Sequence, residues 1–208
     1  MQPVTMADAL EALSSMEEGQ PYSYRRDDPK RRLADELARI SGELGVEPVV
    51  IGGLAVNHHG YMRLTADLDV LLTRSDATAL VRRLKSERGW KRYAEGFKNT
   101  LLDVSVDICV EGERTSPHSP ETFPSPKELQ LVDVDPLPVP TLPELIALKV
   151  MAGRARDDAD VVELLKRHRR RIASVQRRAA ERLRTDGARS RLATLVERAR
   201  EELARRRR

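Results

Sequence analysis

The stretch GGLAVNHHGYMRLTADLDVLL, from Gly52 to Leu72, combines two features that indicate a fold. Its glycine pair directly follows the short β-branched run EPVVI, and glycine both ends a strand and permits a tight backbone turn. The segment LAVNHHGYM then has helical spacing, and the largely apolar ADLDVLLT predicts a second strand. We therefore predict a strand, a glycine turn, a short helix and another strand in succession.

Two carboxylates lie two positions apart at the start of that second strand. Because residues i and i+2 point to the same face of a strand, Asp67 and Asp69 are expected to project together. Their repulsion would raise a pKa unless a cation neutralises them, and Mg²⁺ or Mn²⁺ takes such hard oxygen ligands. The alternative is that both aspartates merely face solvent on an edge strand, since D-x-D alone is a short motif.

A third aspartate lies on another predicted strand. In TLLDVSVDICVEG, residues 100–112, apolar and polar residues alternate, which places Asp107 on a polar face in mid-strand. If the two strands are neighbours, Asp67, Asp69 and Asp107 would together form a metal site for in-line transfer at phosphorus. The glycine turn would let backbone N–H groups approach a triphosphate closely.

Two helices are predicted in the first 46 residues. The second covers residues 28–44, where leucine and isoleucine recur at helical spacing. Asp28 is expected to cap this helix and Gly45 to end it. The helix should pack one apolar face on the core.

Further helices are predicted from capping signals downstream. Ser75 is expected to cap an amphipathic helix that ends at Gly89. Thr141 and Glu144 fit a capping box at the start of another helix. Between these helices, residues 113–127 are rich in proline and serine and predict an irregular loop.

Composition limits the class of protein. The chain has 208 residues and 40% hydrophobic content, enough for one substantial domain with an appendage. One cysteine excludes an intramolecular disulfide framework, and no apolar run approaches the ~18 residues that a membrane-spanning helix needs. The start of the sequence does not resemble a secretory signal, so we predict a cytoplasmic protein without a membrane partner.

The positive charge is concentrated near the end of the sequence. The net charge is +4, but residues 154–208 hold 19 Lys and Arg against 9 Asp and Glu, a net charge of +10. The remaining residues therefore carry −6. Such a segment attracts nucleic acid, but it also suits a well-solvated helical face, and both interpretations stay open. Aromatic content of 3% leaves few side chains on which bases could stack.

Two motifs together carry a resemblance to a known family. VVIGGLAVNHHGYMRLTADLDVLL resembles the signature of the polymerase-beta-like nucleotidyltransferase superfamily. With LIALKVMAGRARDDADVVELL, it resembles the AbiEii-like nucleotidyltransferases, which include toxins of bacterial toxin–antitoxin systems. The resemblance covers roughly residues 47–166. It implies an α/β fold with a small twisted mixed sheet.

That fold divides the sequence into three parts. We expect a helical segment over residues 1–46 that packs on the core, and a nucleotidyltransferase core over residues 47–142. Residues 143–208 are expected to form a helical region that ends in the basic tail.

The resemblance also implies a metal and phosphate site. By position, Gly52 and Gly53 would cradle the nucleotide phosphates, and Asp67, Asp69 and Asp107 would bind the metal. Many members of the superfamily have Gly-Ser at this turn. Here the second residue is glycine, so contact with phosphate is left to the backbone alone.

A second set of residues is implied by the downstream motif and by the approach to the metal strand. Lys149 resembles a phosphate-binding lysine, and Asp157 and Asp160 match an acidic pair, with Asp160 assisting deprotonation of the acceptor hydroxyl. Arg63 and Thr65 are placed to touch phosphate. Three of these residues have a structural alternative: Lys149 as a surface lysine, Asp157 as a helix cap, and Arg63 in an ion pair with an acidic neighbour.

These observations predict an Mg²⁺- or Mn²⁺-dependent enzyme that transfers a nucleoside monophosphate from an NTP to an acceptor hydroxyl. The basic residues 154–208 suggest RNA as the acceptor, tRNA in the related toxins, or a cognate antitoxin protein as a partner. The alternative function is a catalytically silent nucleotide-binding or partner-binding module of the same fold. In such a module the acidic triad would be expendable.

Overall fold

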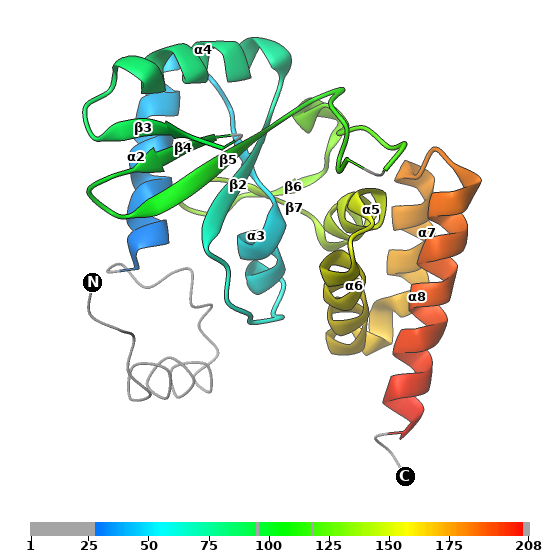
Figure 1. The fold of residues 1–208 in the computed structure, drawn as a ribbon. Coiled ribbons are helices and arrows are strands. Elements are labelled where there is room, and N and C mark those ends of the chain that lie inside the picture. The colour runs from blue at the N-terminus through cyan, green and yellow to red at the C-terminus, as the bar shows by residue number, and fades with distance from the viewer. Residues whose placement is uncertain (1–27, 95, 118, 206–208) are drawn as a thin grey trace, which may run out of the picture.

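The computed structural model describes residues 28–94, 96–117 and 119–205, so the first helix predicted within residues 1–46 lies outside the described part. The described chain folds into a mixed sheet with helices packed around it (Figure 1). In chain order its elements are α2 (Pro29–Leu44), β1 (Val49–Val50), α3 (Gly52–His58), β2 (Asp67–Leu72), α4 (Arg74–Ser86), β3 (Trp90–Tyr93), β4 (Gly96–Asn99), β5 (Val104–Val110), a 3₁₀ turn η2 (Pro126–Glu128), β6 (Leu131–Val132), β7 (Val139–Pro140), α5 (Leu142–Ala152), α6 (Ala155–Arg167), a second 3₁₀ turn η3 (Arg169–Arg171), α7 (Ile172–Arg182) and α8 (Asp186–Arg205).

The main sheet has five strands in the order β1-β2-β5-β4-β3. Its two central strands, β2 and β5, run parallel, whereas each of the other pairs is antiparallel. Strands β6 and β7 form a separate two-stranded sheet. The predicted α/β class, with a small mixed sheet flanked by helices, is confirmed.

The alternation of apolar and polar residues predicted for the strand that carries Asp107 is confirmed in β5. Along β5, the side chains of Val104, Val106 and Ile108 are buried in the core, while Asp107 and Cys109 are only partly buried. The polar face of a central strand is thus open to a cavity, and this is where chemistry can be placed.

Helix α2 begins and ends where its capping residues predict. The Asp28 carboxylate accepts a hydrogen bond from the Lys30 backbone N–H at 2.8 Å, and Gly45 takes the left-handed conformation, with φ of 65°, that ends the helix. Leu33 and Leu37 on its inner face are fully buried in the core.

The predicted bounds of helix α4 were wrong at both ends. Its N-cap is Thr73, whose hydroxyl accepts from the Asp76 backbone N–H at 3.2 Å, while the Ser75 hydroxyl only contacts that of Thr73 at 3.0 Å. The helix ends at Ser86, and Gly89 lies in the turn that leads into β3. The hairpin of β3 and β4, which follows, was not predicted.

The capping box predicted at the start of α5 was also wrong. Thr141 occupies the N-cap position but its side chain makes no capping hydrogen bond. The Glu144 carboxylate instead forms an ion pair with Arg182 of α7 at 2.6 Å. Glu144 therefore takes part in a tertiary ion pair and not in the predicted capping box.

Helices α5, α6, α7 and α8 form a group beside the sheet (Figure 1). Every residue of α5 is buried, because other elements pack on all of its sides. No helix in the described ranges combines the length and apolar character needed to cross a bilayer.

The chain between β5 and η2 is irregular, as residues 113–127 predict. Its hydroxyl groups hold it to the end of α5. Thr115 and Ser119 both donate to the Met151 carbonyl, at 2.9 and 2.5 Å, and Ser116 donates to the Ala152 carbonyl at 2.7 Å. These bonds satisfy carbonyl groups that a helix C-terminus leaves unpaired.

Candidate active site

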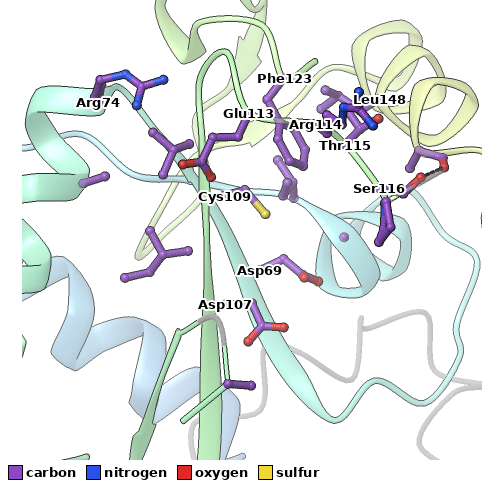
Figure 2. A pocket seen from close by; sticks show the side chains of 18 of the residues that line it. Asp69, Arg74, Asp107, Cys109, Glu113, Arg114, Thr115, Ser116, Phe123 and Leu148 are labelled. Atoms are coloured by element: carbon purple, nitrogen blue, oxygen red, sulfur yellow. Dashed lines mark hydrogen bonds between the residues drawn. The ribbon is translucent and has the colours of Figure 1, made fainter. Parts of the chain in front are cut away.

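Three aspartates meet where β2 and β5 run side by side. Asp69 is directly opposite Asp107 in the parallel pairing, and Asp67 is opposite Ser105. One carboxylate oxygen from each of Asp67, Asp69 and Asp107 lies within 4.8 Å of the other two. Figure 2 shows Asp69 and Asp107 extending from neighbouring strands into one cavity. The prediction that the three carboxylates lie together is confirmed.

The electrostatics of this cluster favour a bound cation. Burial raises the pKa of Asp69 to about 6, and the nearby Asp67 and Asp107 charges act in the same direction. Lys149 and a hydrogen bond from the Gly53 backbone N–H oppose the shift only in part. Ionised carboxylates crowded in this way are the hard oxygen ligands that Mg²⁺ or Mn²⁺ takes, so the donor set fits such an ion.

The glycine pair makes room for side chains of this same protein. Gly52 has φ of +65°, and a β-carbon there would stand 1.8 Å from Asp69 Oδ2. A β-carbon on Gly53 would stand 2.5 Å from Thr65 Oγ1. On the side where a β-carbon would stand, the space beside the turn is occupied by Asp69 and Thr65, while Gly52 also borders the cavity.

Lys149 is buried in an ion cluster. Its ammonium lies 2.9 Å from Asp157 Oδ1 and 2.9 Å from Asp160 Oδ2, and its side chain is 6% exposed. It was expected to extend outward from α5, yet that helix has no solvent-facing side. An ammonium has three donors, so one N–H remains for the cavity that Lys149 lines.

Asp160 uses both of its carboxylate oxygens in ion pairs. The Arg63 guanidinium binds it with two bonds, from Nε at 2.6 Å and from Nη2 at 2.8 Å, in addition to its contact with Lys149. The alternative that Arg63 pairs with an acidic neighbour is therefore confirmed. With both oxygens engaged, the Asp160 carboxylate fixes the position of the Arg63 guanidinium.

Arg154 is a member of the cluster that sequence reasoning missed. Its Nε donates to Asp157 Oδ2 at 2.7 Å, and this bond raises the pKa of Arg154. Burial alone would raise the pKa of Asp157, but hydrogen bonds from Arg154 and Lys149 hold it below its ordinary value. Both partners therefore stay charged at neutral pH.

The loop before β2 is tied to this cluster and to the triad. The buried Asn57 side chain, also missed from the sequence, bonds both backbone groups of Arg63: its Oδ1 accepts from the N–H at 3.0 Å and its Nδ2 donates to the carbonyl at 3.1 Å. Two residues on, the Thr65 hydroxyl donates to Asp67 Oδ1 at 3.1 Å. A continuous set of bonds thus joins Asp160 to Asp67.

Two members of the triad, Asp69 and Asp107, border a cavity of about 990 Å³. Asp69, Asp107 and Lys149 line it, together with one face of α4 and the start of the loop after β5. Figure 2 shows Arg74 and Arg114 on opposite sides of the upper part of the view, with the two aspartates below them. This volume lies at the upper end of the range for small-molecule and cofactor sites, ~300–1,000 Å³.

No known family profile matches the sequence, and neither does any curated protein. Among solved structures, the chain is similar to ANT(2″)-Ia in complex with adenylyl-2″-tobramycin, with 14% identity over 80% of this chain and 97% of that chain, and a TM-score of 0.39. It is also similar to the STING-associated CdnE c-di-GMP synthase from Capnocytophaga granulosa, with 12% identity over 94% of this chain and 92% of that chain, and a TM-score of 0.32.

Proposed function

We propose that the protein is a metal-dependent nucleotidyltransferase that moves a nucleoside monophosphate from an NTP to an acceptor hydroxyl. The observation that carries this proposal is the triad, three aspartates from paired parallel strands with oxygens within 4.8 Å of one another. A binding module without chemistry has no need to hold three carboxylates so close at the cost of their repulsion.

The residues of the site have separate tasks in this reaction. Asp67, Asp69 and Asp107 would hold one or two Mg²⁺ or Mn²⁺ ions, which supply positive charge against the phosphate oxygens. The free N–H of Lys149 donates to a phosphate oxygen from the cavity wall. The backbone of Gly52 and Gly53 keeps Asp69 and Thr65 in place and borders the phosphates.

The acidic pair on α6 acts on the site indirectly. We assign Asp160 a positioning role, since it holds Arg63 and, through the loop before β2, Thr65 and Asp67. Asp157 neutralises Lys149 and Arg154 beside the cavity.

The reaction follows from the chemistry of an NTP. The acceptor oxygen bonds to the α-phosphorus, the bond from that phosphorus to the bridging oxygen breaks, pyrophosphate leaves and the hydroxyl proton passes to solvent. We propose RNA as the acceptor, because cationic side chains outnumber carboxylates among the described residues that line the cavity.

The test is transfer of label from each of the four NTPs, labelled at the α-phosphate or at the γ-phosphate, to total RNA with Mg²⁺ or Mn²⁺ present. We expect α-label to become fixed in RNA while γ-label leaves as pyrophosphate. Asp67→Ala should abolish transfer, and Asp133→Ala, an exposed aspartate outside the cavity, should leave it unchanged. Transfer of γ-label, or transfer that survives Asp67→Ala, would show that the proposal is wrong.

A further inference from the structure

One wall of the cavity is a basic stripe on helix α4. Arg74, Thr78, Arg82 and Lys85 follow one another at helical spacing, line the cavity and are exposed. The stripe extends over twelve residues, and the eleven steps between the first and the last correspond to about 16 Å along the helix axis. Arg92 on β3 and Arg114 after β5 add two more exposed cations to the same cavity.

These cations are available for a ligand. In the described part of the chain, none of Arg74, Arg82, Lys85, Arg92 and Arg114 forms an ion pair with a carboxylate. Arg74 does bond Glu111: its backbone N–H donates to the carboxylate at 3.0 Å and its Nη2 donates to the carbonyl at 3.4 Å. The carboxylates that line the cavity do not balance them either. Asp69 and Asp107 belong to the triad, Asp157 is paired with Lys149 and Arg154, and Glu113 alone is left over.

The C-terminal helices carry more positive charges in total than the stripe on α4, but many of their cations already have carboxylate partners. Of the sixteen Lys and Arg between residues 154 and 205, eight form ion pairs with carboxylates of this same chain. Lys166 bonds Glu202 at 2.7 Å and Arg191 bonds Asp158 at 2.6 Å, so these charges join helices to one another. Half of the described cations in this segment are therefore already held in ion pairs within the chain.

We propose that the basic stripe on α4, with Arg92 and Arg114, binds the phosphate backbone of the acceptor strand, and that the C-terminal helices do not. This inference rests on the proposed nucleotidyl transfer, which brings the acceptor into this cavity. A surface about 16 Å long spans roughly five phosphates of one strand at ~3.4 Å per phosphate. A triphosphate has fewer phosphates than that and lies at the metal, so it does not account for the length of the stripe.

The test uses the full-length protein and a short fluorescent single-stranded RNA of mixed sequence. Binding is measured by anisotropy over a range of salt concentrations, without NTP, for wild type and for Arg82→Gln/Lys85→Gln. Glutamine is a good helix former, so α4 should fold normally, which circular dichroism checks. Losing two phosphate contacts should lower the slope of log affinity against log salt by roughly 1.4.

The matched control is Arg169→Gln/Arg170→Gln, which removes two exposed charges from the C-terminal region without touching the cavity. We expect this control to keep the wild-type slope. A second arm measures binding of each Mg²⁺–NTP by calorimetry, and the α4 variant should keep the wild-type affinity for the NTP.

Several results would overturn the inference. One is an unchanged slope in the α4 variant, and another is a fall confined to the control, which would place RNA on the C-terminal helices. Weaker NTP binding with unchanged RNA binding would assign the stripe to the triphosphate. A wild-type protein that binds no RNA, but transfers α-label to another acceptor, would remove this inference and keep the nucleotidyltransferase. RNA binding by the stripe without any label transfer would keep the surface and remove the proposed function.

Discussion

Asp69 lies against the backbone of Gly52 so closely that its Oδ2 atom is 1.8 Å from where a β-carbon on that glycine would stand. This carboxylate of the triad is thus positioned by the absence of a side chain seventeen residues earlier. Four predictions follow from this and the other contacts of the site.

Gly52→Ala should abolish transfer and lower the free energy of unfolding by about 2–4 kcal/mol, because alanine adopts a positive φ poorly and must displace Asp69. Urea denaturation and the labelling assay measure the two effects. Gly42→Ala is the control: Gly42 lies within α2 with nothing within 4 Å, so alanine there should stabilise the protein by about 0.5–1 kcal/mol. Normal activity in Gly52→Ala would contradict the assigned role of the turn.

Asp69→Asn should stabilise the metal-free protein above pH 6 although it removes activity. The pKa of Asp69 is raised in the folded protein to about 6 from 3.8, so its ionisation costs folding free energy, about 1–3 kcal/mol for a partly buried group. This cost is fully present above pH 6 and disappears as pH falls toward 3.8, so the gap between variant and wild type should close over that window. Denaturation with a chelator present measures it, with Asp133→Asn as the control, and a destabilised variant at neutral pH would contradict it.

Mn²⁺ should bind the wild-type protein, and its affinity for Asp107→Asn should be lower by at least about tenfold. Even substitution of a residue that only hydrogen-bonds to a metal ligand costs about this much affinity. The electron paramagnetic resonance signal of free Mn²⁺ reports binding without any need for turnover. Affinity should fall below pH 6, where a proton competes for Asp69. Equal Mn²⁺ binding by wild type and Asp107→Asn would show that the triad is not the metal site.

Asp160→Asn should lower the free energy of unfolding by about 3 kcal/mol, because it leaves the buried Lys149 and the partly buried Arg63 without their shared carboxylate. The neighbouring Asp158→Asn breaks a more exposed pair with Arg191 and should cost at most about 1 kcal/mol. Denaturation of both variants supplies the comparison. If Asp160 served only as a catalytic base, its variant would lose activity at unchanged stability, which is the outcome that contradicts a positioning role.

The parts of the fold that could be predicted from the sequence are those where one local pattern decides the structure. Alternation along residues 104–110 put Asp107 on the open face of its strand, and the two-residue spacing put Asp67 and Asp69 on one face of theirs. The hairpin was missed because β3 is an edge strand whose residues, apart from the buried Trp90, are exposed and mostly charged or polar.

The residues misplaced or missed in the site depend on distant contacts. Lys149 follows a helical pattern that suggested a polar side, but its helix is enclosed by elements that the local sequence does not reveal. Arg82 and Lys85 have the spacing of an ordinary solvated face, and only the folded chain shows that this face borders the cavity. Asn57 gave no signal, since its partner is the backbone of Arg63.

The bonds from Lys149 through Asp160 to Arg63 also limit how the molecule can move. They connect the C-terminal helices to the loop that precedes β2. A hinge motion that separated these two parts would therefore leave buried charges without their partners, at a cost of about 3–5 kcal/mol. If the protein carries out the proposed transfer, we expect the floor of the cavity to stay closed through each turnover. Substrates would enter and products leave across the rim, between α4 and the loop that carries Arg114.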